Sequence, residues 1–316
     1  MTEKIAILMS TYNGEQYLST QLQSIIDQDN NEWHLYIRDD GSSDKTCDII
    51  RKFANENNSI TFLNDGRIQN IGVAQSFMNL LENVNADFYM FSDQDDFWKK
   101  DKVTKTVDFM QTFDYKNQPI AVYTNLQVVD DKLIGDKALL NHNWQDFLAL
   151  LFTNNAYGCT MMINNQLKKL INFKKLNFQN IYMHDWWLVL VAAAFGKVGY
   201  LDQKTILYRQ HGDNQVGASE KSIFSYLYRV LNPRRDRTAL KRTIGLATEF
   251  NNEYYDANLD KLIKKYLQGY GTLYKKSSFF NNLKLVSEYP PHSVYFLKKL
   301  YYGYIITFFY SDYKKG

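Results

Sequence analysis

Three carboxylates lie close together in the chain, directly after an aromatic-rich apolar run. Asp93, Asp95 and Asp96 follow residues 86–92, whose composition is typical of a buried strand. Ionised carboxylates this close repel one another unless a positive charge neutralises them. Mg²⁺ prefers oxygen ligands, and it commonly keeps water and substrate phosphates in its shell beside one or two protein carboxylates. The spacing therefore predicts a Mg²⁺ or Mn²⁺ site that carries a phosphorylated substrate.

Other polar residues follow two further predicted strands. Thr11 comes after the strand 5–9, and Asp39 and Asp40 come after the strand 33–38. Taken alone, Thr11, Asn13 and the Asp39–Ser42 segment could be ordinary turn formers, because Asp, Asn, Gly and Ser favour turns. Their position beside a second acidic strand end favours a nucleotide site.

Strands that alternate with helices position these residues. The predicted strands include residues 5–9, 33–38, 60–63, 86–92 and 120–123, and the predicted helices are 15–28, 46–55, 72–83 and 102–113. This alternation predicts an α/β fold with a doubly wound sheet, in which ligands bind at the carboxyl ends of the strands.

The second half of the chain is less regular and ends in a basic region. A strand is predicted at 157–163, an apolar helix at 186–195, and short strands at 198–201 and 206–209. Residues 221–316 hold 17 Lys and Arg against 7 Asp and Glu, whereas residues 1–220 hold 20 against 27. We predict a catalytic domain at 1–220 and a basic, aromatic-rich helical region at 221–316.

Composition and termini indicate a cytoplasmic protein. Two cysteines, Cys47 and Cys159, fit a reducing compartment, and packing is the expected role of Cys159. The first residues do not resemble a signal peptide. The longest apolar runs, 186–196 and 300–310, are far shorter than the ~20 residues that span a bilayer.

Five motifs in order carry a resemblance to a known family. They are Met9–Gly14, Arg38–Asp44, Ser92–Trp98, His184–Trp187 and Tyr208–Asn214. Together they resemble glycosyltransferase family 2, whose members have a GT-A (Rossmann-like) fold with a mixed sheet flanked by helices. The Asp-Gln-Asp-Asp-Phe-Trp, His-Asp-Trp and Tyr-Arg-Gln-His segments resemble bacterial rhamnosyltransferases of cell-wall and capsular polysaccharide synthesis. The resemblance covers roughly residues 4–220.

The resemblance implies an inverting transfer from a nucleotide-sugar, dTDP-rhamnose or a UDP-sugar, to a polyprenyl-diphosphate-linked glycan. It assigns Thr11, Asn13 and Glu15 to donor contacts, Asp39 and Asp40 to the base and ribose, Asp93, Asp95 and Asp96 to the metal and diphosphate, Asp185 to the general base, and Arg209 and His211 to diphosphate or metal contacts. Asp95 or Asp96 could be the direct metal ligand.

Elementary chemistry supports some of these roles and leaves alternatives. Asp185 precedes Trp186 and Trp187 at the start of an apolar helix, where burial would raise its pKa and the helix N-terminus would lower it. It could instead cap the helix. Arg209 and His211 lie two residues apart, so a strand would present both on one side, although a lone histidine is often structural.

The basic tail suggests an anionic partner. Clustered cations at 234–242 and the lysine-aromatic segment 298–310 favour a lipid interface. The polyprenyl-diphosphate-linked acceptor that the resemblance implies would place the enzyme at the inner face of the membrane. Packing within a helical bundle is the alternative. A module that binds nucleic acid or membrane without catalysis would leave the acidic cluster unexplained, and no nucleic-acid partner is predicted.

Other enzyme classes fit less well. A UDP-hexose transferase would show the same catalytic motifs, so the donor sugar stays open. A nucleotidyltransferase would usually need a glycine-rich phosphate loop after the first strand, where only Gly14 occurs. A dehydrogenase is disfavoured because no Gly-x-Gly-x-x-Gly follows that strand.

Overall fold

The computed structural model describes residues 3–138, 144–210, 233–293 and 296–313. The chain divides into two compact units. We call Met1–Gln145, Asn155–Phe173 and Met183–Ala218 the sheet unit, and Asp146–Asn154, Lys174–Tyr182 and Ser219–Gly316 the helical unit. The domain division predicted at residue 220 lies outside the described residues, and it differs from these units in keeping 146–154 and 174–182 with the first domain.

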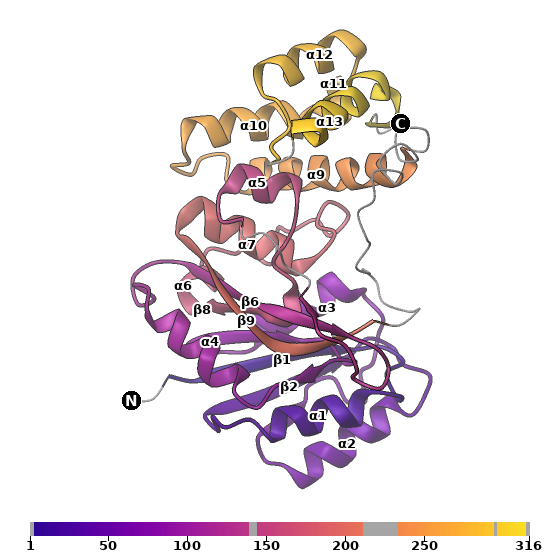
Figure 1. The fold of residues 1–316 in the computed structure, drawn as a ribbon, viewed down its shortest axis with the longest axis vertical. Coiled ribbons are helices and arrows are strands. Elements are labelled where there is room, and N and C mark those ends of the chain that lie inside the picture. The colour runs from indigo at the N-terminus through magenta and orange to yellow at the C-terminus, as the bar shows by residue number, and fades with distance from the viewer. Residues whose placement is uncertain (1–2, 139–143, 211–232, 294–295, 314–316) are drawn as a thin grey trace. The chain divides into compact units, whose positions relative to one another are not determined.

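A nine-stranded mixed sheet forms the centre of the sheet unit (Figure 1). Its strands are β1 (Ile5–Thr11), β2 (Trp33–Asp39), β3 (Ile60–Phe62), β4 (Phe88–Ser92), β5 (Phe97–Trp98), β6 (Ile120–Val129), β7 (Lys137–Ala138), β8 (Met161–Asn164) and β9 (Lys197–Arg209). The order is β3-β2-β1-β4-β8-β6-β9-β5, with β7 paired to β6. The first four strands run parallel, and β8 is antiparallel to both of its neighbours. The predicted α/β class and mixed sheet are confirmed.

Helices cover both faces of this sheet. They are α1 (Leu18–Ile26), α2 (Thr46–Glu56), α3 (Val73–Asn83), α4 (Lys102–Gln111), α6 (Asn165–Lys168) and α7 (His184–Phe195). Strand side chains alternate between faces. Phe88 and Met90 of β4 therefore join the cluster formed with α1, α2 and α4, whereas Phe91 contacts Phe77 of α3 and His184 of α7.

The described part of the helical unit contains α5 (Phe147–Phe152), α9 (Arg234–Glu253), α10 (Lys261–Gly271), α11 (Leu273–Lys276), α12 (Phe279–Glu288), α13 (Phe296–Phe308) and the 3-10 turn η2 (Tyr310–Tyr313). Aromatic side chains form its interior. Phe147 packs against Phe250, and Phe152 against the fully buried Tyr270. Side-chain caps begin three of these helices, since Asp146 accepts from Ala149 N, Asp260 from Leu262 N and Ser278 from Asn281 N.

Three local predictions differ from the structure. The two short strands predicted at 198–201 and 206–209 are one strand, β9. Its pairing with β6 shifts register on either side of Asn125. The strand predicted at 157–163 begins as a 3-10 turn, η1 (Gly158–Thr160), and only Met161–Asn164 are extended. Helix α7 begins at His184, so Asp185 lies in its first turn rather than at the cap, Met183. Within the described ranges, none of the helices combines the length and apolar character needed to cross a bilayer.

Candidate active site

Parallel pairing brings the predicted polar residues to one edge of the sheet. Thr11 is in register with Asp39, and Met9 with Ser92, which directly precedes Asp93. The carboxyl ends of β1, β2 and β4 therefore meet, as the sequence predicted. The loops that leave these ends carry the donor-binding and metal-binding candidates.

Asp39 and Asp40 are buried, and both are engaged within the chain. Asp39 accepts hydrogen bonds from Thr11 Oγ1 at 2.8 Å, from Ser42 Oγ at 2.6 Å and from two backbone amides. Asp40 forms an ion pair with Arg38 at 2.6 Å and accepts from Ile71 N and Gly72 N. Both carboxylates thus hold the loop after β2 in place, and their contact with a nucleotide stays a prediction.

The loop after β1 is fastened to its neighbours. Asn13 has a left-handed backbone (φ 48°). Its backbone N–H donates to Ser42 Oγ, and its side-chain Oδ1 accepts from Ser43 N. Glu15 accepts from Lys45 N at 3.0 Å. The side chains of Asn13 and Glu15 are exposed, whereas Thr11 is buried. Asn13 and Glu15 thus link the loop after β1 to the loop after β2, and their contact with a ligand stays a prediction.

The acidic loop between β4 and β5 is held by its one neutral member. Gln94 accepts from Tyr12 N at 2.8 Å and donates to Tyr12 O at 2.9 Å. A Cβ at Gly14 would lie only 2.4 Å from Gln94 Oε1, so a larger residue there would displace the Gln94 side chain from Tyr12. Sequence reasoning did not single out Gln94. Its reciprocal bonds join the acidic loop to the loop after β1.

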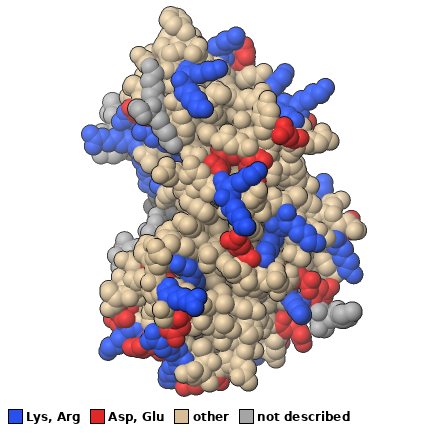
Figure 2. Space-filling model, turned by 180° about the vertical axis from the view of Figure 1, so that it is seen from behind, with Lys and Arg blue, Asp and Glu red and all other residues tan. Residues whose placement is uncertain are grey.

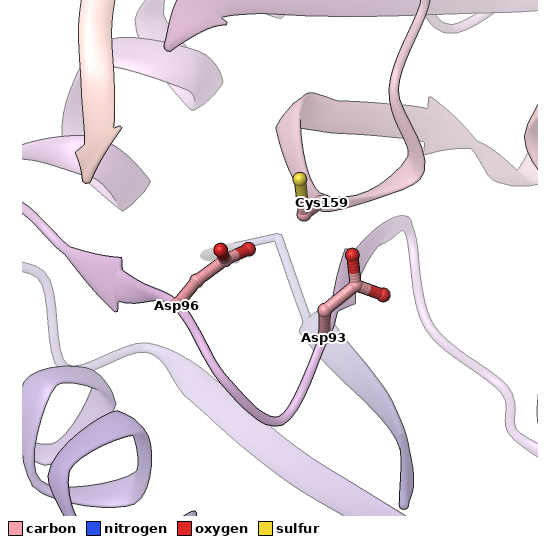
Figure 3. A group of neighbouring side chains, drawn as sticks. All are labelled: Asp93, Asp96 and Cys159. Atoms are coloured by element: carbon pink, nitrogen blue, oxygen red, sulfur yellow. The ribbon is translucent and has the colours of Figure 1, made fainter. Parts of the chain in front are cut away.

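Two of the predicted metal ligands approach a cysteine thiol (Figure 3). One ligand atom from each of Asp93, Asp96 and Cys159 lies within 4.8 Å of the other two. Asp96 and Cys159 are buried, whereas Asp93 and Asp95 are partly buried. Sequence reasoning assigned Cys159 only to packing, and nothing beyond its residue type could have indicated this position.

Burial and mutual repulsion disfavour the charged forms of these acids. Burial, followed by the charges of Asp95 and Asp185, raises the pKa of Asp93 to about 7. Burial and the charges of Asp95 and Asp93 raise the pKa of Asp96 well above its usual value. Within the described residues, Oδ2 of Asp96 is buried without a hydrogen-bond partner of normal geometry. A buried carboxylate oxygen with repelling neighbours fits a divalent cation, which would relieve both costs.

A buried lysine lies near the same cluster. Lys102 is fully buried, its Nζ stands 4.7 Å over the ring of Trp98, and that ammonium has no hydrogen-bond partner in the described part of the chain. Burial lowers the pKa of Lys102 to about 8, although the charges of Cys159 and Asp96 act in the opposite direction. Lys102 thus supplies a nearby positive charge that the sequence did not reveal.

Asp185 lies in α7, on the face of the sheet away from α1, α2 and α4, and its side chain reaches the cluster of Asp93, Asp96 and Cys159. Its Oδ2 accepts from Gly158 N at 2.8 Å, directly beside Cys159, and its charge acts on Asp93. His184 stacks on Phe77 at 4.1 Å, and a Cβ at Gly158 would lie 2.8 Å from His184 Nε2. The absence of a side chain at Gly158 therefore permits the close approach of η1 and α7.

Arg209 supports the acidic loop from the end of β9. Its Nε donates to Asp95 O at 2.9 Å, its backbone N donates to Asp96 Oδ1, and another guanidinium nitrogen donates to Asp131 O. The guanidinium lies 4.4 Å from the centre of the Tyr17 ring, and only 3% of Arg209 is exposed. The structure thus brings Arg209 to the site, where it holds backbone. His211, the other predicted contact, lies outside the described residues.

Sequence comparison identifies the family of this chain. Residues 6–169 match the model of Glycosyl transferase family 2. The chain is 33% identical over 270 residues to a dTDP-rhamnosyl transferase, RfbG, of Shigella flexneri, covering 81% of this chain and 91% of the relative. It is 24% identical to a UDP-Glc:alpha-D-GlcNAc-diphosphoundecaprenol beta-1,3-glucosyltransferase, WfgD, of Escherichia coli, covering 59% of this chain and 69% of that protein.

Solved structures agree on the fold. S. aureus TarS 1–349 in complex with UDP-GlcNAc matches with a TM-score of 0.55 at 16% identity, covering 96% of this chain and 81% of that chain. The mannosyltransferase PcManGT from Pyrobaculum calidifontis, in complex with GDP-Man and Mn²⁺, matches with a TM-score of 0.52 at 12% identity, covering 98% and 83%. The chain belongs to glycosyltransferase family 2 and has the GT-A fold.

Proposed function

We propose that this member of glycosyltransferase family 2 transfers L-rhamnose from dTDP-rhamnose to a hydroxyl of a lipid-linked glycan, with inversion at the anomeric carbon. One observation carries the choice of donor: the 33% identity, over 91% of its length, to a protein named a dTDP-rhamnosyl transferase. The acidic cluster at the sheet edge, with Asp185 beside it, supports the reaction type.

A divalent cation, Mg²⁺ or Mn²⁺, is part of this proposal. Asp93, Asp95 and Asp96 would hold it, with Asp95 or Asp96 as the direct carboxylate ligand. When bound, such a cation offsets the negative charge that develops on the leaving nucleoside diphosphate. The buried Oδ2 of Asp96 and the repulsion among the three acids support this assignment.

Asp185 is the proposed general base. It would accept the proton of the acceptor hydroxyl as that oxygen forms its bond to the anomeric carbon, while the bond from that carbon to the diphosphate oxygen breaks. A single displacement of this kind inverts the configuration. The hydrogen bond from Gly158 N supports the role, because it orients the carboxylate.

The remaining predicted residues would bind the donor. Thr11, Asn13, Glu15, Asp39 and Asp40 belong to the rim formed by the loops after β1 and β2, and we propose that this rim holds the nucleotide. Arg209 would act mainly by fixing the acidic loop, since its guanidinium donates to backbone carbonyls. His211 stays a proposed diphosphate or metal contact.

A polyprenyl-diphosphate-linked acceptor, at the inner face of the cytoplasmic membrane, completes the proposal. The Escherichia coli relative is named for a diphosphoundecaprenol-linked acceptor, which supports this acceptor class. The basic helical unit supports a negatively charged surface as a partner.

The test is a panel of donors assayed for turnover with and without Mn²⁺. We expect release of the free nucleotide from dTDP-rhamnose only when a divalent cation is present. A second candidate is a UDP-sugar transferase, which the UDP-GlcNAc complex of the TarS neighbour favours. Turnover of UDP-glucose, UDP-galactose or UDP-N-acetylglucosamine in place of dTDP-rhamnose would establish that alternative, and turnover of none of them would contradict the proposal.

A further inference from the structure

One side of helix α13 in the helical unit is apolar and exposed. Five residues of α13 are exposed, and all are large apolar or aromatic side chains: Phe296 (69%), Leu297 (68%), Leu300 (57%), Tyr304 (42%) and Phe308 (58%). Most of them are spaced by four residues, so they form one stripe along the helix. A surface helix of a globular protein normally exposes polar residues instead.

The stripe continues onto helix α12. Phe308 contacts Tyr304 at 5.0 Å and Phe279 at 5.5 Å between ring centroids, and Phe279 contacts Phe280 at 5.4 Å. Phe280 is 79% exposed. We define the α12–α13 face as Phe280, Phe296, Leu297, Leu300, Tyr304 and Phe308. A contiguous apolar surface of this kind marks an interaction site more often than scattered apolar residues do.

The opposite side of α13 is fixed by specific contacts with α12. A Cβ at Gly303 would lie 2.8 Å from Val286 Cγ1, so the two helices approach closely there. The fully buried Asn282 donates from Nδ2 to Ile306 O at 2.7 Å. These contacts set the rotation of α13, and the exposed stripe therefore follows from the packing of the unit.

Cationic side chains accompany the α12–α13 face. Lys275 and Lys276 are exposed directly before α12, and Lys284 is exposed within it. Lys299 lies in the first turn of α13, whereas the neighbouring Lys298 points to the buried Tyr302 ring and donates to Thr153 Oγ1. Glu288, 3.9 Å from Lys284, is the sole acidic residue of α12 and α13. In the upper part of Figure 2, cationic side chains with some acidic ones among them lie on a largely uncharged surface.

Charge selects the occupant of this face. In a symmetric pair of chains, the lysines around the face would meet the same lysines of the second copy and repel them. Anionic lipid headgroups would attract them instead, while the apolar stripe enters the acyl boundary. With 13 residues, α13 is too short to span a bilayer, so it would lie in the plane of the interface.

We propose that the α12–α13 face docks the protein on an anionic lipid bilayer. This deepens the proposed function, because it names the surface that would hold the enzyme beside a lipid-linked acceptor. It rests on that function only for the identity of the membrane, since lipid binding requires no sugar transfer. The two ideas can therefore fail separately.

The test is co-sedimentation of the full chain with vesicles. We compare equimolar phosphatidylglycerol and phosphatidylcholine with phosphatidylcholine alone. The double variant Leu297→Glu/Leu300→Glu removes the centre of the stripe, and Ile134→Glu/Tyr255→Glu is the matched control, because both control residues are more than 60% exposed and lie outside the face. We expect the wild type and the control to bind the anionic vesicles, and the stripe variant to bind at least tenfold more weakly.

A second variant tests the charge. Lys275→Gln/Lys276→Gln/Lys284→Gln should weaken binding to the anionic vesicles by about fivefold for each lysine, and raised salt should have a similar effect. Donor turnover in solution should be unchanged in both variants, which shows that they fold. Equal binding by the stripe variant and the wild type, or no binding by the wild type, would overturn the proposal. A wild-type dimer that the stripe variant splits, without vesicle binding, would assign the face to a second copy instead.

Discussion

The two units depart from the usual burial pattern in opposite ways. In the sheet unit, charged groups that normally face water are buried together beside the thiol of Cys159: Asp96, Asp185 and Lys102. In the helical unit, large apolar side chains that normally lie inside are exposed along α13. Buried charge and exposed apolar surface both carry a free-energy cost unless a partner relieves it.

The difference indicates what kind of partner each unit needs. Repelling carboxyl groups around a buried oxygen call for a small cation and the phosphates that it carries. An apolar stripe among lysines calls for a broad partner surface with anionic groups at its outside and an apolar layer beneath them, as in a lipid bilayer. Substitutions should therefore separate into those that stop chemistry and those that change only attachment. The following predictions test that separation, from the largest expected effect to the smallest.

Asp185→Asn should have the largest effect. It removes the proton acceptor but keeps the shape of the side chain and an oxygen for the Gly158 amide. We expect turnover to fall about 10³-fold, while the affinity for dTDP measured by calorimetry stays unchanged. Asp108→Asn on the exposed side of α4 is the control and should leave turnover intact. Equal loss of turnover and nucleotide affinity would instead show a structural role for Asp185.

Asp96→Asn should have the next largest effect. It keeps the buried shape but removes one negative charge from the cluster. We expect Mn²⁺-dependent donor binding to weaken by about 10- to 100-fold, measured by titration with Mn²⁺ at fixed dTDP. Asp95→Asn is the comparison that identifies the direct ligand. An unchanged Mn²⁺ titration in Asp96→Asn would remove that residue from the metal site.

His184 predicts a pH effect on stability. Burial lowers the pKa of His184 to about 3, far below the usual value near 6.5. The unfolded state therefore binds a proton that the folded state does not, and the free energy of unfolding should fall as pH drops from about 6.5 towards 3. From this group alone, the loss is about 1.4 kcal/mol per pH unit.

Because its pKa is raised, Asp93 binds a proton in the folded state over part of this pH range, which increases the free energy of unfolding as pH falls. The contribution of His184 must therefore be measured as a difference between two proteins. The comparison is between the wild type and His184→Gln, whose side chain stays neutral, in urea unfolding at pH 7, 6 and 5. The wild type should lose stability more steeply. Parallel slopes for the two proteins would show that His184 does not titrate on unfolding.

An exposed charge in the same unit should matter least. Asp65 pairs with Arg51 at 2.9 Å on the surface, where water and salt weaken the interaction. We expect Asp65→Asn to shift the melting temperature by no more than about 1–2 °C and to leave turnover unchanged. A large loss of activity would show that this surface pair contributes to the site.

Sequence reasoning recovered the strands that form the site because their signals are local. Residues 5–9 and 33–38 are apolar runs followed by turn-forming residues, and β1 and β2 end within two residues of the predicted positions. It misjudged 197–209, where the polar residues in the middle of β9 look like a break but are exposed residues of a continuous strand. It also could not separate Asp96 from Asp95, because both follow the same strand and only packing buries one of them.

By itself, the sequence determined the residue types at the strand ends, the positions of the first strands along the chain and the basic character of the C-terminal region, because each depends on neighbours along the chain. Only the tertiary structure decided that Cys159, Lys102 and Asp185 join the acidic loop, that Arg209 holds backbone, and that α13 exposes its apolar side. These features depend on contacts between residues far apart in the chain, and burial of a side chain is a property of those contacts.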